Sequence, residues 1–222
     1  MPISRFFLLM FAIGFGLVGC VTQPPIKMVH TEIATFHRLP PTVAGTTFVF
    51  VPGAEQAGSL EYSAYENQIR QGLLAHGLVE APVESAAVAV SFRYYIDTGK
   101  QVNISVPVWG QTGVGTSFTT GTVSDSGSYN ATTNYVPTYG VTGYANQSIN
   151  VFTRRLDLVL FDAENRTGAD QKPLYESHAV SKGSSGQLPL ISPLMIESIF
   201  AEFPGRSGSV RQVSLQCTEC QR

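Results

Sequence analysis

The sequence predicts an α+β fold: a two-layer sandwich in which two amphipathic helices cover one face of a mainly antiparallel sheet. Strand-like alternation of apolar and polar residues recurs along the chain, and two segments carry apolar residues at three- and four-residue steps. A long stretch rich in Gly, Ser and Thr separates the predicted strands. With 43% hydrophobic and 14% charged residues, the 222-residue chain has the composition of a globular domain rather than of a disordered chain.

The first half of the domain reads as strand, helix, strand. Residues 46–51 are β-branched and aromatic and end at Pro52, which indicates a strand. A helix is predicted from Ser59, a good N-cap residue, to the glycine that follows His76. Its apolar face is formed by Tyr62, Tyr65, Ile69 and Leu73. Residues 88–95 alternate between apolar and other side chains, as is typical of a half-buried strand.

The second half adds two strands and a helix. Residues 154–162 and 174–180 are predicted strands, joined by a polar turn over 162–170. The second helix is predicted to begin at Ser192-Pro193 and to end at Pro204-Gly205. We therefore expect one domain over residues 46–205, which is large enough to bury a core without a cofactor. Residues 20–45 are expected to be a tether with a first strand starting near Thr31, and residues 206–222 a C-terminal tail.

Residues 101–150 differ from the rest of the chain in charge. They contain a single charged residue, Asp125, with seven Gly and fifteen Ser or Thr. We expect a long β-hairpin or loop inserted between core strands, with weakly specified pairing in its middle. Exposed aromatic residues are enriched at interfaces, so this segment is a possible contact surface, although it can equally be an insert that pairs only with its own sheet. The candidate contact residues are Trp109, Tyr129, Tyr135, Tyr139 and Tyr144.

The first 20 residues have the order of a secretory signal: one cation, Arg5, then an apolar run from Phe6 to Val18, then small residues. The junction Leu17-Val18-Gly19-Cys20 resembles the bacterial lipobox. In that family the cysteine thiol receives a diacylglycerol, the preceding residues, here 1–19, are cleaved, and the new amine is acylated. We therefore expect Cys20 to be a lipid attachment site that binds the protein to a membrane. Val21, in place of an aspartate, resembles the sorting pattern for the outer membrane, which predicts a periplasm-facing lipoprotein.

Cys217-Thr218-Glu219-Cys220 is a CxxC motif near the C-terminal end of the sequence. A redox CxxC usually opens a helix whose dipole lowers the pKa of the first thiol, and no helical pattern follows this one. A zinc site needs further ligands, and the chain has no second pair of cysteines. We expect Cys217 and Cys220 to form a local disulfide in an oxidising compartment, with a thiol redox role as the alternative.

No other pattern points to catalysis, a metal or a cofactor. The formal charge of −2 offers no basic field for nucleic acid. The glycines at 113 and 115 lack the third glycine and the helix of a dinucleotide fingerprint. Asp157 and Asp162 lie five residues apart on one strand and are expected on opposite faces, so they form no acid–base pair. The scattered histidines are expected at the surface or at caps: they are His30, His37, His76 and His178.

The chain resembles the bacterial lipoproteins that share a domain of unknown function, DUF4136. The resemblance covers about residues 46–204 and rests on four features: Leu73 to Leu78 at the end of the first helix, the strand from Val88 to Tyr95, the run from Leu156 to Ala163, and the final Phe203-Pro204. Where the family often has a tryptophan in the next strand, this chain has Tyr175. The resemblance implies an envelope lipoprotein and supplies no catalytic residues.

Three functions are compatible with the sequence. The first is a lipid-anchored envelope protein, not an enzyme, that acts through protein contacts made by the 101–150 segment or by an open sheet edge. The second is a thiol redox factor that uses the CxxC. The third is a carrier of a small apolar ligand between the helices and the sheet.

Overall fold

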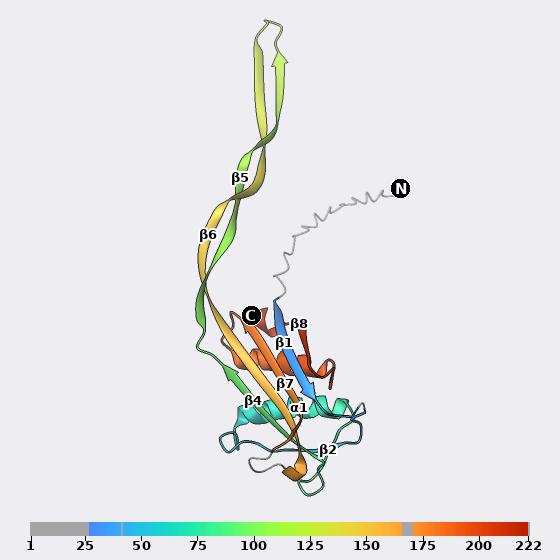
Figure 1. The fold of residues 1–222 in the computed structure, drawn as a ribbon. Coiled ribbons are helices and arrows are strands. Elements are labelled where there is room, and N and C mark those ends of the chain that lie inside the picture. Colours follow the sequence, from blue (N-terminus) through green and yellow to red (C-terminus); the bar gives the residue numbers. More distant parts are fainter. Residues whose placement is uncertain (1–26, 41, 166–170, 222) are drawn as a thin grey trace, which may run out of the picture.

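The computed structural model describes residues 27–40, 42–165 and 171–221. Its helices and strands follow one another as β1 Met28–His37, β2 Thr47–Phe50, α1 Leu60–Ala75, β3 Val79–Glu80, β4 Val88–Ile96, β5 Lys100–Val123, β6 Tyr129–Asp162, a 3₁₀ turn at Ala163–Asn165, β7 Pro173–Gly183, α2 Leu188–Phe200, β8 Ser209–Gln216 and a 3₁₀ turn at Glu219–Gln221. Figure 1 shows a compact body from which β5 and β6 project together as a long ribbon.

The body is built on one mixed sheet with the order β3-β2-β4-β6-β7-β1-β8. The short strand β2 is parallel to β3 and to β4, and the pairs from β4 to β8 are antiparallel. The chain is therefore α and β with a mostly antiparallel sheet, as the sequence predicts at this level. Strand β5 lies off this order and pairs only with β6.

The helices pack on the sheet through apolar side chains. Helix α2 contacts β1, β6, β7 and β8, and α1 packs against α2. The ring of Tyr62 in α1 stacks on Phe92 of β4 with 4.2 Å between centroids. Ile69 and Leu158, from the helical and sheet layers, are both fully buried. The helices therefore owe their stability to burial of their apolar faces rather than to intrinsic propensity.

Helix α1 agrees with its sequence signals. The Ser59 hydroxyl accepts a hydrogen bond from the backbone N–H of Tyr62 at 3.2 Å, which satisfies one of the free donors of the first turn. At the other end, Gly77 has φ +83°, a left-handed conformation that glycine adopts without strain. Both predicted ends of this helix are confirmed.

The first strand expected near Thr31 is present and begins at Met28. Two other predicted boundaries are wrong. The expected C-terminal tail contains β8, which pairs with β1 from Met28↔Gln216 to Thr35↔Ser209. Helix α2 begins at Leu188, a turn before Ser192-Pro193, because Pro189 occupies its first turn and Pro193 lies inside the helix. Strands β1 and β8 are neighbours at one edge of the sheet, although they come from opposite ends of the domain, and neither segment reveals this pairing on its own.

Candidate functional site

The candidate contact segment is a two-stranded β-ribbon, here named the arm: residues 101–123 of β5 and 129–150 of β6. Its strands pair from Gln101↔Asn150 to Val123↔Tyr129, and a turn that contains Asp125 joins them. The prediction of a hairpin is confirmed. Pairing is defined along the whole arm, and the expected irregular middle appears as three register shifts between Val108 and Thr116. Such shifts increase the local twist, which Figure 1 shows as a coiled ribbon.

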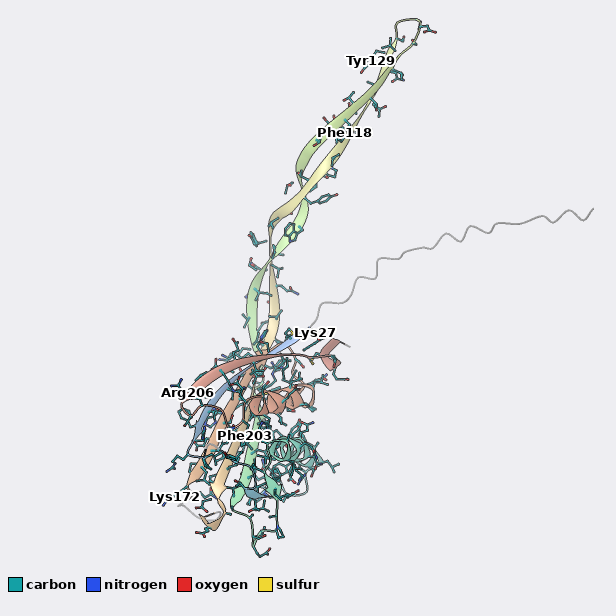
Figure 2. All side chains as sticks on the ribbon, turned by 90° about the vertical axis from the view of Figure 1, so that its right-hand side faces the viewer. Lys27, Phe118, Tyr129, Lys172, Phe203 and Arg206 are labelled. Carbon is teal, nitrogen blue, oxygen red and sulfur yellow. A yellow bond between two sulfur atoms is a disulfide. The ribbon has the colours of Figure 1, made fainter. Side chains whose placement is uncertain are left out.

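No side chain of the arm is buried. The five candidate contact residues are all strongly exposed: Trp109 70%, Tyr129 66%, Tyr135 67%, Tyr139 71% and Tyr144 72%. The structure adds Phe118, which is 61% exposed and which the sequence analysis treated only as part of a strand. Figure 2 shows Phe118 and Tyr129 on the distal arm, far from the body. The alternation of aromatic residues with Thr and Gly could have singled out Phe118 as well.

The distal part of the arm is regular. Between Thr116↔Val136 and Val123↔Tyr129 the register has no shift, so alternate pairs share a face of the ribbon. The hydroxyls of Thr119 and Thr133 lie 2.9 Å apart across the strands. On the face of Tyr129, a Cβ at Gly121 would lie 2.4 Å from the tyrosine hydroxyl oxygen and 2.6 Å from the ring, so glycine lets this side chain lie over the strand.

Polar groups fix the root of the arm to the body. The Asp97 carboxylate accepts hydrogen bonds from the backbone N–H groups of Thr153 at 2.9 Å and Gly99 at 3.0 Å. The hydrogen bond from Thr153 is the largest cause of a lowered pKa of Asp97, and the bond from Gly99 lowers the pKa further. The adjacent Arg154 guanidinium is buried and donates to the Ser185 carbonyl at 3.1 Å, and its desolvation lowers the pKa of Arg154.

A second cluster lies on the sheet at the other end of β6. Asp157 and His178 are direct cross-strand partners, with 2.7 Å between Oδ1 and Nδ1, and Arg155 Nε donates to the same carboxylate at 2.8 Å. Asp157 and His178 border a hollow of about 430 Å³ that Arg93 and Glu176 also line. The sequence analysis missed this pair, because a residue's partner on a neighbouring strand depends on the register.

The order of side chains across the sheet argues against a hydrolytic triad in this hollow. Asp157 is opposite Arg93 on one side and His178 on the other, and the next partner of His178 is Ala34. A triad needs the imidazole between the carboxylate and a nucleophile, whereas here the carboxylate stands between two cationic or basic groups. Asp162 lies apart and caps the following turn by accepting from the N–H of Glu164 at 3.1 Å. The arrangement is that of a surface ion-pair cluster.

The family model for a domain of unknown function, DUF4136, matches residues 36–205. The chain belongs to this family. The DUF4136 match includes the arm and both helices, and it omits β8 and most of β1. The motif from Leu156 to Ala163 that carries the resemblance forms the end of β6, where Leu156, Leu158 and Leu160 are buried and Asp157 faces the hollow.

Among solved structures, a PDZ domain protein from Parabacteroides distasonis is similar to this DUF4136 chain at 13% identity, with a TM-score of 0.46. The similarity covers 85% of this chain and 39% of that chain. No curated protein matches.

The structure joins Cys217 and Cys220 by a disulfide, as expected from the sequence. Cys217 is 2% exposed and belongs to the hydrophobic core. The preceding backbone continues the sheet, with the Cys217 N–H donating to the Lys27 carbonyl at 2.9 Å. A redox cysteine must be accessible to its substrate, so this burial favours a structural disulfide over the redox alternative.

The remaining candidates concern binding of lipids, ligands or metals. Cys20 and the rest of the lipobox lie outside the described residues. In the part of the chain that the structure describes, no helix has the length and hydropathy of a membrane span. Within those same residues, no three His, Cys, Asp or Glu side chains gather as metal ligands. Between the helices and the sheet, fully buried side chains such as Phe48, Ile69 and Leu160 fill the space, which disfavours the carrier alternative.

Proposed function

We propose that this DUF4136 protein is a non-catalytic, lipid-anchored component of the bacterial envelope that binds a protein partner through its arm. Lipid on Cys20 would hold it at the outer membrane, with the domain on the periplasmic side. Both helices lie on one face of the sheet in this proposal, consistent with Figure 2, which also shows the arm extending away from both layers. The lipobox supports the location, and the arm supports the mode of action.

One observation carries the proposal: the arm has no buried residue and one charged residue, and it exposes six aromatic side chains. Solvent-facing strands normally carry charged residues that keep them soluble and unpaired. Aromatic residues without charges are instead the composition of interface cores, where each buried ring removes a large apolar area from water. A surface of this composition is explained by a partner that covers it.

Site-specific photo-crosslinking in cells tests the arm. A photo-reactive residue replaces Tyr139 on the arm, and a second variant carries it at Leu60, which is 88% exposed on α1. We expect Tyr139 to give a discrete adduct, with the same protein identified by mass spectrometry in repeated experiments, and Leu60 to give none. Equal adducts from both positions, or none from Tyr139, would contradict a contact surface on the arm.

The lipid anchor needs its own test. Intact mass spectrometry of the protein extracted in detergent should show a chain that begins at Cys20 and carries acyl groups, and Cys20→Ala should release the protein from the membrane fraction. A Cys20→Ala protein that stays in the membrane fraction at the wild-type level would refute anchoring through this residue.

A further inference from the structure

The distal arm, residues 116–123 and 129–136, has two open edges. Its strands pair with each other, and the sheet order gives β5 no other neighbour. Each outer edge therefore presents unpaired backbone N–H and C=O groups to solvent. A two-stranded hairpin is marginally stable in water, whereas three or more strands with a covered face are stable. The distal arm is thus a strand pair that gains stability from every strand added to it.

The sequence of the distal arm favours such addition. Residues 116–123 (Thr-Ser-Phe-Thr-Thr-Gly-Thr-Val) and 129–136 (Tyr-Asn-Ala-Thr-Thr-Asn-Tyr-Val) have high β-propensity and neither charge nor proline. Natural edges are protected by lysine, proline or bulges. In the arm these devices are confined to the proximal half and its boundary: Pro107, Pro137 and the three register shifts. The distal edges have none.

From these edges we propose that the distal arm pairs edge to edge with the distal arm of a second copy of this chain, so that two hairpins form a four-stranded sheet. A copy offers an edge of the same length and regularity. Pairing two copies brings no like charges together along the edge, since Asp125 is the only charged residue of the arm and lies in the turn. An antiparallel pair about a twofold axis brings the same edge of both copies together, so one contact is self-complementary and joins two chains.

The exposed aromatic area fits an interface of this kind. An aromatic side chain contributes about 150–250 Å² when fully buried. The distal arm carries three of the six aromatic side chains, Phe118, Tyr129 and Tyr135, which are 61–67% exposed. Edge pairing places such side chains beside their cross-strand neighbours on the other copy, so that part of this apolar area leaves water.

Cysteine crosslinking in membranes tests this proposal. The chain has three cysteines, of which Cys217 and Cys220 form a disulfide and Cys20 is the proposed lipid site. Thr119→Cys on β5 and Thr133→Cys on β6, made separately, each place one thiol on a distal edge strand. Leu60→Cys on α1 is the control for random collision. We expect dimers on non-reducing gels from at least one arm variant, well above the Leu60→Cys level.

A charge placed on the edge sharpens the test. The lysine is added to the strand that carries the thiol: Thr120→Lys with Thr119→Cys, and Thr132→Lys with Thr133→Cys. It puts like charges near each other in the paired edges, and we expect the dimer yield to fall about fivefold. Adding Ser126→Lys, the same charge in the turn, should leave the yield unchanged. A yield that the lysine on the crosslinking strand does not lower would show that the dimer does not use the edge, and overturn the proposal.

This inference rests on the proposed function, and the two fail in different ways. If neither arm cysteine exceeds the Leu60→Cys level while Tyr139 still photo-crosslinks to another protein, pairing with a second copy is wrong and the contact surface stands. If the Tyr139 adduct is also absent, both proposals are wrong.

Discussion

Strand β6 lies in two environments along its 34 residues. In the body it has β4 and β7 as neighbours, and Leu156, Leu158 and Leu160 are buried under the helices. In the arm it has β5 alone and no buried residue. The body is therefore stabilised by its own layers, whereas the arm has only a ladder of hydrogen bonds and the cross-strand contacts of exposed side chains. The difference shows a body stabilised by its own packing, and it supports the proposal that the arm is a contact surface.

A cavity in the body gives the largest expected effect. Leu158→Ala removes a side chain with no exposed surface, and we expect the free energy of unfolding to fall by about 2–5 kcal/mol. The matched arm variant is Val114→Ala, because Val114 is 52% exposed. This variant should change the free energy of unfolding by less than about 0.5 kcal/mol. Urea unfolding of the full chain measures both. Similar losses from the two variants would break the distinction between body and arm.

The contact between the helices gives a smaller effect. A methyl group at Gly72 would come within 2.4 Å of the Phe200 ring, so Gly72→Ala forces α1 and α2 apart. Overpacking costs about 1–3 kcal/mol, and the better helix propensity of alanine returns about 1 kcal/mol. We therefore expect urea unfolding to show a loss of about 1 kcal/mol in the free energy of unfolding. Gln71→Ala, at the neighbouring exposed position, is the control. A gain in stability from Gly72→Ala would mean that the helices are not tightly packed here.

Shortening the arm should have less effect than either substitution. Gln111 and Tyr139 are cross-strand partners, so an Asn-Gly turn in place of residues 112–138 closes a shorter hairpin. We expect the free energy of unfolding to change by less than about 0.5 kcal/mol, because the removed residues bury nothing in the body. Adducts of the proposed partner should disappear with the same deletion. A strong loss of stability would show that the arm supports the body.

The root of the arm should respond to acid without loss of the global fold. The pKa of Asp97 is lowered in the folded state, so its contribution is present at neutral pH and is lost as the pH falls through the folded pKa. Asp97→Asn should remove this dependence. Hydrogen exchange of the Thr153 and Gly99 amides, which donate to Asp97, reports the effect. Equal acid sensitivity in Asp97→Asn and the wild type would exclude this carboxylate as the cause.

Local patterns in the sequence predicted the elements with strong signals. The Ser59 cap, the stripe from Tyr62 to Leu73 and the alternation in residues 88–95 each report a structure formed by neighbouring residues. The hairpin was predicted in the same way, because a chain segment so rich in Thr, Gly and aromatics favours extended backbone.

Features that depend on distant residues were missed. A first strand is expected near Thr31, but its pairing with β8, which lies in the expected C-terminal tail, joins segments from opposite ends of the domain. The Asp157–His178 contact follows from the register of β6 and β7, which no local motif specifies. The sequence offers two prolines that suit a first helical turn, and the structure uses Pro189 there while Pro193 lies inside α2.

Hydrogen exchange of the distal arm in membranes is the most direct test of a covered contact surface. Mass spectrometry would compare residues 116–136 in isolated membranes with the same residues in dilute detergent solution, with the peptide that covers α1 as the internal control. A partner that covers the arm predicts slow exchange of the distal arm in membranes, fast exchange after dilution, and no change in α1. Equally fast exchange of the distal arm in both samples would contradict the account.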